Sequence, residues 1–229
     1  MRFPLGLAFI MMALLVPLPI MADEPDSLGA ARELGTGGSA GGSLRRASTN
    51  PTMPLAEAAL ADVRDILSRN NSCSSFFGGT GEVVAVLDGL AGRIQSRKLG
   101  NRYIGITMSG VETTFVSYLT GYQYRLFKNV IINTDGPFYN RGNAFFPQSR
   151  CGSFWPNTRE ARVLMLLHEL GHLIKSVDGK WLLPDDGDSD LRSLMNTRTV
   201  EAKCMAQIKA LQARDGVARK SETDAGHKR

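Results

Sequence analysis

The chain has 229 residues, of which 43% are hydrophobic and 21% are charged, and its formal net charge at pH 7 is +5. The positive charge is spread along the chain, and no basic run alternates with aromatic residues. This pattern does not indicate a nucleic-acid-binding protein. Without residues 1–53 and 213–229, which are described below, about 160 residues remain. That length is enough for one domain with its own core.

The first 22 residues are typical of a signal peptide. Arg2 supplies a short positive start, residues 5–16 form an apolar or small stretch, and Ala22 ends the segment. Pro17 and Pro19 and the short apolar core argue against an uncleaved membrane anchor. We therefore expect a secreted or periplasmic protein that is not an integral membrane protein after signal cleavage.

The composition then divides the rest of the chain into three parts. Residues 23–53 are rich in glycine and serine and predict a flexible linker. Residues 54–212 form the expected domain, and residues 213–229 predict a polar disordered tail.

Within the domain, apolar residues recur at helical spacing over residues 54–68 and 80–96, which predicts two helices. Residues 103–108, 113–118 and 129–133 are rich in β-branched side chains and predict three short strands. Two further helices are expected near the C-terminus. This order of helices, a small sheet and helices predicts an α+β fold.

A five-residue motif, His168-Glu169-Leu170-Gly171-His172, contains two of the three histidines of the chain. On a helix, residues four apart lie on one face, so both imidazoles could bind the same metal ion. The glutamate between them could then take a proton from a water molecule. We therefore predict that His168 and His172 bind a metal, with Glu169 as the general base.

The flanks of the motif are apolar and contain neither a charge nor a proline from Met165 to Ile174, apart from the motif itself. Such a helix is buried, and buried histidines and a buried glutamate are costly unless a zinc ion or hydrogen bonds satisfy them. Asn157 and Glu160 have the spacing of a capping box, which predicts a helix from about residue 157 to Val177.

The motif and its uncharged flanks resemble those of the zincin metallopeptidases. The run from Leu183-Pro184-Asp185-Asp186-Gly187 to Cys204 also resembles a group of small exported bacterial proteins with no established substrate. The resemblance to zincins implies a small zincin-like domain with a short mixed sheet, a buried motif helix and a C-terminal helix. It also implies Zn²⁺ as cofactor and an edge strand beside the motif helix that binds extended substrate. Residues 130–134 are our candidate for that strand, although a plain core strand fits the sequence equally well.

A catalytic zinc needs a third protein ligand, and three carboxylates compete for that role. Metzincins have glycine at the position of Lys175 and a ligand at the position of Asp178, whereas thermolysin-like zincins use a glutamate for which Glu201 is the candidate. Asp186 lies in a Pro-Asp-Asp-Gly turn that could fold back over the metal. We favour Asp186 because this turn belongs to the second resemblance.

Three cysteines in an exported chain suggest one disulfide and one unpaired thiol. Cys204 lies on the apolar face of the last expected helix, with Val200, Ile208 and Leu211. We expect Cys73 to pair with Cys204, which would connect the start of the domain to its end, and Cys151 to remain free.

These features together predict an exported zinc-dependent hydrolase, most simply a peptidase that acts on peptides or proteins. The alternative is a non-catalytic binding or structural module with a degenerate or structural metal site. The sequence does not identify the group that stabilises the oxyanion, nor the oligomeric state. Four side chains are eligible as oxyanion donors, namely Tyr118, Tyr122, Tyr139 and Arg141.

Overall fold

Three helices begin the part of the chain that the computed structural model describes, which is residues 53–118, 120–143 and 149–226. They are α1 (Met53–Leu67), α2 (Ser72–Phe76) and α3 (Glu82–Ala91). Asn71 caps α2, since its side chain accepts hydrogen bonds from the backbone N–H groups of Cys73 and Ser74. The expected signal peptide and nearly all of the expected linker lie outside the described residues.

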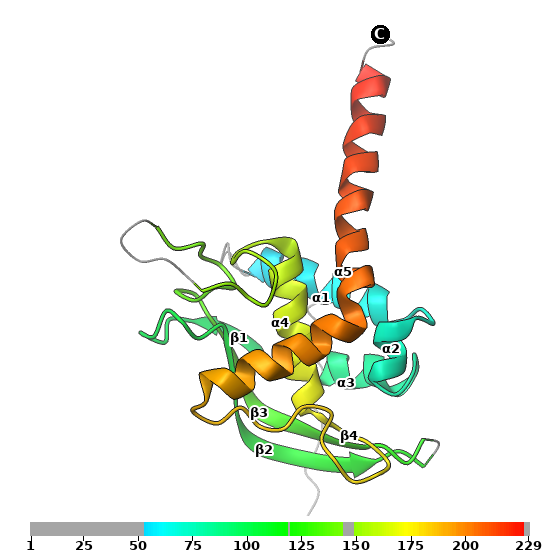
Figure 1. Ribbon diagram of the computed structural model, residues 1–229, viewed down its shortest axis with the longest axis vertical. Helices are drawn as coiled ribbons and strands as arrows, with labels where there is room; N and C mark the ends of the chain where they lie inside the picture. The colour runs from blue at the N-terminus through cyan, green and yellow to red at the C-terminus, as the bar shows by residue number, and fades with distance from the viewer. Residues whose placement is uncertain (1–52, 119, 144–148, 227–229) are drawn as a thin grey trace, which may run out of the picture. The chain divides into compact units, whose positions relative to one another are not determined.

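The sheet contains four strands, β1 (Ile94–Arg97), β2 (Ile106–Val116), β3 (Gln123–Asn133) and β4 (Ile174–Lys175). Their order is β1-β3-β2, and β4 pairs with the start of β3. The pairing of β1 with β3 is parallel, whereas β2 and β4 run antiparallel to β3. With five helices and a small mixed sheet in its described part, the protein is an α+β protein (Figure 1).

Two expectations about the strands are wrong. Residues 103–108 and 113–118 do not form two strands, because residues 106–108 and 113–116 both belong to the single long strand β2, which a bulge between Val111 and Thr113 interrupts. Residues 130–133 do not form an edge strand either, because β1 pairs with them on one side and β2 on the other. The continuous burial of these residues therefore reflects a central strand.

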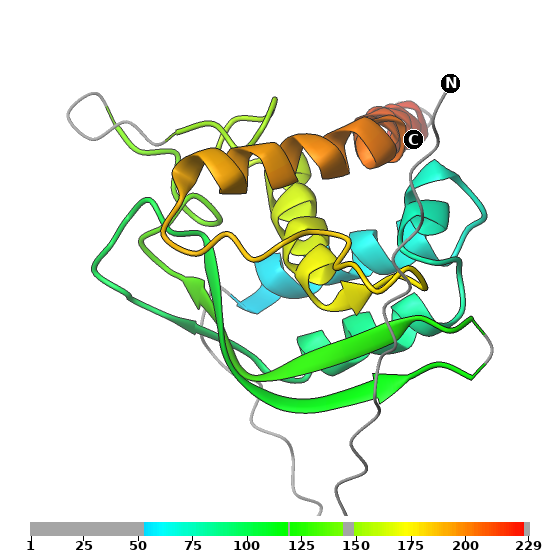
Figure 2. The same cartoon turned by 60° about the horizontal axis from the view of Figure 1, so that its bottom comes forward.

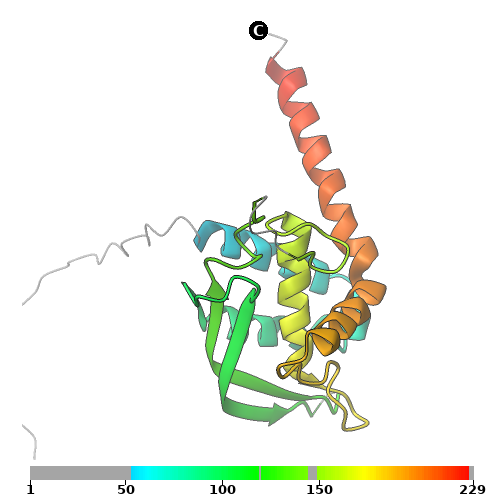
Figure 3. The same ribbon diagram turned by 60° about the vertical axis from the view of Figure 1, so that its left-hand side comes forward.

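Helix α4 (Arg159–His172) carries the motif and lies between the sheet and α5 (Figures 2 and 3). The expected capping box at Asn157 is wrong: Asn157 has a left-handed backbone, with φ of 58°, and Thr158 is the N-cap. The Thr158 hydroxyl accepts a hydrogen bond from the backbone N–H of Ala161 at 3.2 Å. The helix also ends five residues earlier than expected, at His172.

The chain reverses direction directly after α4. Ile174 and Lys175 form β4, and the backbone N–H of Leu182 donates to the carbonyl oxygen of Ile174 at 2.9 Å. This short hairpin brings Leu183 back to the motif helix, where its N–H donates to the carbonyl oxygen of Gly171 at 3.3 Å. The segment that follows runs between the sheet and α5 (Figure 2). Lys175 is thus a strand residue paired with Gln123.

The last helix, α5 (Asp190–Gly226), packs against α4 through its first half. Its apolar side chains Val200, Ile208 and Leu211 are buried. The helix continues through residues 213–226, where we expected a polar disordered tail. Alanine, arginine, lysine and glutamate together make up half of that segment and favour a helix, and no proline ends it.

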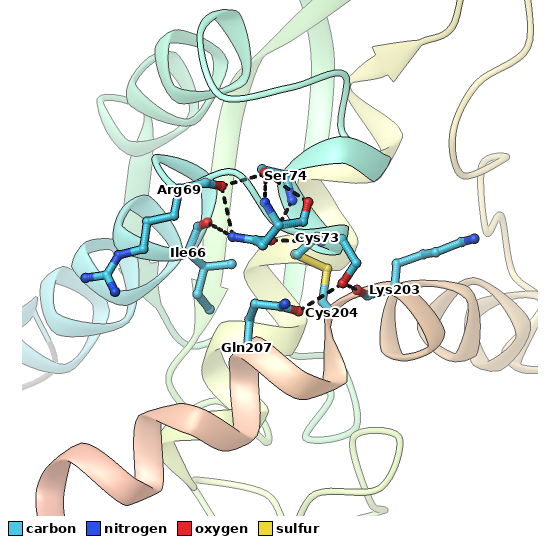
Figure 4. The surroundings of a disulfide bond; sticks show 9 residues. Ile66, Arg69, Cys73, Ser74, Lys203, Cys204 and Gln207 are labelled. Carbon is cyan, nitrogen blue, oxygen red and sulfur yellow. Dashed lines mark hydrogen bonds between the residues drawn. A yellow bond between two sulfur atoms is a disulfide. The ribbon is translucent and has the colours of Figure 1, made fainter.

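A disulfide joins Cys73 on α2 to Cys204 on α5, the same pair that the sequence favoured (Figure 4). Hydrogen bonds continue the contact between the two helices, because the hydroxyl of Ser72 donates to the carbonyl oxygen of Lys203 at 2.7 Å. Cys151 is a free, half-buried thiol, and burial raises its pKa to about 11.

One continuous core lies between the sheet and the helices. Its largest fully buried side chains include Tyr124, Phe77, Phe138, Leu67, Leu87, Leu90, Ile132, Leu164, Leu166 and Leu167. Within the described residues, no helix combines the length and the apolar character that a membrane span requires.

Candidate metal centre

Three side chains from two parts of the chain converge at the C-terminal end of α4. The Nε2 atoms of His168 and His172 are 3.1 Å apart, as expected for residues one helical turn apart on a single face. The carboxylate of Asp186 completes the group, with Oδ2 3.0 Å from His168 Nε2 and Oδ1 3.6 Å from His172 Nε2. Among the described residues, this is the one group of three or more His, Cys, Asp or Glu side chains close enough to share an ion.

The spacing of the donor groups is compatible with a zinc ion. Ligands bound 2.0–2.1 Å from a tetrahedral zinc are about 3.3–3.4 Å apart. The two Nε2 atoms are 3.1 Å apart, and each lies 3.0–3.6 Å from one oxygen of the Asp186 carboxylate, Oδ2 for His168 and Oδ1 for His172. Two nitrogen donors and one carboxylate are also a donor set that zinc prefers. Three protein ligands leave the fourth tetrahedral position to water or substrate.

The far nitrogens of both imidazoles have hydrogen-bonding partners. His172 Nδ1 is 3.3 Å from the carbonyl oxygen of Leu183, and a carbonyl can only accept. Neutral His172 therefore carries its proton on Nδ1, which leaves the lone pair of Nε2 free for a metal. His168 Nδ1 lies 3.0 Å from the hydroxyl of Thr197 on α5. Such partners fix ring orientation in metal sites.

The side chain of Asn196 holds Asp186. The Nδ2 atom of Asn196 donates to Asp186 Oδ1 at 2.5 Å and to the carbonyl oxygen of Pro184 at 2.7 Å. Asn196 is 4% exposed and comes from the first turns of α5, next to Thr197. Each of the three candidate ligands is thus positioned by a neighbouring polar group.

The charges of the site act on one another. Burial alone would raise the pKa of Asp186, but hydrogen bonds from His168 and His172 hold it well below its ordinary value. Burial alone would lower the pKa of His172, but its hydrogen bond with Asp186 and the negative charge of Glu169 raise that pKa. Asp186 and His172 together favour an ionised carboxylate beside a protonated imidazole. A metal ion in place of that proton would also stabilise the carboxylate.

Glu169 lies beside this group and is half-buried. Burial raises the pKa of Glu169, and the nearby histidines partly oppose that shift. A half-buried carboxylate beside the two histidines is placed to accept and return a proton.

The other two carboxylates considered as ligands lie elsewhere. Asp178 is in the exposed turn of the hairpin, where it accepts hydrogen bonds from the Ser176 hydroxyl and from the backbone N–H of Lys180. Glu201 is buried, but its Oε1 accepts a hydrogen bond from the backbone N–H of Ser153 at 2.6 Å. Neither belongs to the group of ligand atoms at the motif.

Tyr122, Tyr139 and Arg141 contact residues outside the motif. Tyr118 is fully exposed, and the hydroxyl of Tyr139 is 2.9 Å from that of Ser96. The ring of Tyr122 packs beside Gly78. Arg141 lines a pocket with Thr158 at the start of α4, ten residues or about 15 Å along the helix from His168.

Asn196 and Thr197 are the positions of the site to which sequence reasoning assigned no role. They lie one turn before Val200, on the side of α5 that continues as its apolar face. Two polar residues that extend the buried face of a helix are a signal of an internal polar contact, and this signal was available in the sequence.

Comparison of the chain with family models, with curated proteins and with the solved structures found no match. A function for the protein therefore rests on the geometry and chemistry of the site itself.

Proposed function

We propose that the protein is an exported, zinc-dependent peptidase, in which His168, His172 and Asp186 bind Zn²⁺ and Glu169 is the general base. The observation that carries this proposal is the convergence of two imidazole nitrogens and one carboxylate, at distances compatible with zinc, beside a half-buried glutamate. The disulfide between Cys73 and Cys204 supports export, because such bonds persist in oxidising compartments.

When bound, zinc supplies Lewis acidity, which polarises a carbonyl group and makes water a stronger acid. Glu169 takes a proton from the attacking water and returns it to the leaving amine. Thr197 and the carbonyl of Leu183 keep both imidazoles in the orientation that presents Nε2 to the metal. The number of protein ligands favours catalysis over a purely structural role, since structural zinc sites usually have four.

The first test compares the purified protein with its Glu169→Gln variant on casein or a quenched fluorescent peptide. We expect the variant to retain zinc and to lose at least about 100-fold in kcat/KM, because it keeps the shape of the side chain but cannot accept a proton. Glu201→Gln is the control, because Glu201 is a buried glutamate that lies outside the ligand group.

The second test concerns the metal. His168→Ala should abolish stoichiometric zinc binding, whereas His227→Ala, at the one histidine of the sequence outside the motif, should not. A wild-type protein that binds zinc but cleaves no peptide would support the binding or structural module instead. Equal activity of the wild-type protein and the Glu169→Gln variant would exclude the proposed mechanism.

A further inference from the structure

Arg125 on β3 connects the sheet to the end of the motif helix. Its side chain is buried, with 8% of the residue's surface exposed. Its Nε donates to the carbonyl oxygen of His172 at 2.7 Å, and its backbone N–H donates to the carbonyl oxygen of Leu173 at 2.9 Å. The guanidinium also stacks on the ring of Trp181, at 4.0 Å from the ring centroid.

The outer edge of the same guanidinium binds the turn that carries the third ligand. Its Nη2 forms an ion pair with Asp185, and its Nη1 lies 3.5 Å from the other carboxylate oxygen. The two neighbouring aspartates therefore serve different partners, because Asp185 faces Arg125 whereas Asp186 faces the two histidines. The Arg125 side chain thus contacts both His172, a candidate ligand, and Asp185, the residue next to the candidate ligand Asp186.

We infer that Arg125, through Asp185, is a positioning residue that sets the separation of His172 and Asp186 and thereby the affinity of the site for zinc. Ligands that are held in place before the metal arrives bind it more tightly than ligands that must first be ordered. Arginine suits this task because its planar fork can donate to a carbonyl and a carboxylate at once while it stacks on an aromatic ring. The inference rests on the proposed function only for the identity of the metal.

The other contacts of the turn at residues 184–186 show how Arg125 can affect the position of Asp186. On the other side, Asn196 holds the carbonyl of Pro184 and the carboxylate of Asp186. The guanidinium of Arg192 donates to the carbonyl oxygen of Asp185 at 3.1 Å. The Arg125–Asp185 pair is the side-chain link that ties the turn to the sheet, and it keeps the Asp185 carboxylate away from the metal.

The decisive experiment measures the zinc dissociation constant by competition with a chromogenic chelator. The Asp185→Asn variant removes the ion pair at a side chain that is 67% exposed, so it should fold normally. We expect zinc to bind about tenfold more weakly, which is the lower end of the range for residues that support metal ligands. Asp62→Asn is the matched control, because it breaks a two-bonded pair with Arg159, at 2.6 and 2.7 Å, near the opposite end of α4. Zinc affinity should not change in the control.

A second comparison tests whether the two residues act together. Arg125→Gln should weaken zinc binding at least as much as Asp185→Asn, and the double variant should be no weaker than Arg125→Gln alone. Arg125→Lys should restore only part of the affinity, since an ammonium group cannot reproduce the fork. If the buried Arg125 variants fold poorly, Asp185→Asn still decides the question.

The outcomes separate this inference from the proposed function. Unchanged zinc affinity in Asp185→Asn, or an equal loss in Asp62→Asn, overturns the positioning role alone. A wild-type protein that binds zinc tightly but cleaves no peptide overturns the peptidase, and the expected loss in Asp185→Asn would still support the positioning role. A wild-type protein that binds no zinc overturns both.

Discussion

At the scale of single residues, the candidate site includes polar groups that are not themselves candidate ligands. Thr197 and the Leu183 carbonyl contact the far nitrogens of the two imidazoles, and Asn196 contacts the carboxylate of Asp186. The direction of each hydrogen bond matters more than its strength, because it decides which atom of the ligand is left with a free lone pair.

We expect Thr197→Val to weaken zinc binding about tenfold, because valine keeps the shape of threonine but cannot hold Nδ1 of His168. The measurement is the same chelator competition, together with a far-UV circular dichroism spectrum to verify folding. Thr199→Val is the control on the same helix, since the Thr199 hydroxyl bonds only the Met195 carbonyl of its own helix and is exposed. Equal affinities in the two variants would contradict a role for Thr197.

At the scale of elements, the motif helix and the returning turn approach each other closely at Gly171. A Cβ atom at this position would lie 2.6 Å from side-chain atoms of Leu183. Leu183 is 1% exposed and therefore has little room to move. The small residue of the motif thus lets the turn reach the helix, so that the Leu183 carbonyl meets His172.

Gly171→Ala should therefore destabilise the protein, although the same change inside a free helix stabilises it by about 1 kcal/mol. We expect a net loss of about 1–3 kcal/mol from the overpacked contact. For a domain of this size, that loss corresponds to a fall in Tm of several degrees, on the order of 2–4 °C per kcal/mol. Gly81→Ala is the control, because a Cβ at Gly81 meets nothing within 4 Å. A Tm equal to that of the wild type would show that the Leu183 side chain can move aside for the added Cβ, and it would contradict this prediction.

At the scale of the whole molecule, the disulfide holds the last helix against the first part of the domain. It closes a loop with a sequence separation of 131 residues. Helix α5 contributes Asn196 and Thr197 to the site, eight and seven residues before Cys204. Anchoring α5 at Cys204 therefore also limits where those two side chains can lie.

Replacing both Cys73 and Cys204 with alanine should lower the free energy of unfolding by about 2–5 kcal/mol, because the unfolded chain regains the entropy of a long loop. The fall in Tm should be on the order of 10 °C. Thermal unfolding followed by circular dichroism measures it, and Cys151→Ala, at the free thiol, should stay within a few degrees of the wild type. A disulfide-free variant as stable as the Cys151→Ala control would exclude this role.

Local patterns in the sequence determined several features of this protein. The i, i+4 spacing of His168 and His172 places both imidazoles on one face of a helix without tertiary information, whereas the contacts with Thr197 and the Leu183 carbonyl orient the two rings. The apolar spacing of residues 54–68 likewise determined α1, and the α+β class follows from the order of the elements.

Long-range contacts decided the rest. The long β2, the central place of residues 130–133 and the end of α4 at His172 depend on pairing partners that are far away in sequence. Asp178, Asp186 and Glu201 are chemically equivalent as ligands, so only the hairpin after α4 could place Asp186 at the histidines. The physical reason is that a metal site is a set of distances between distant residues. Those distances are set by chain reversals and by buried polar contacts such as Arg125 with His172.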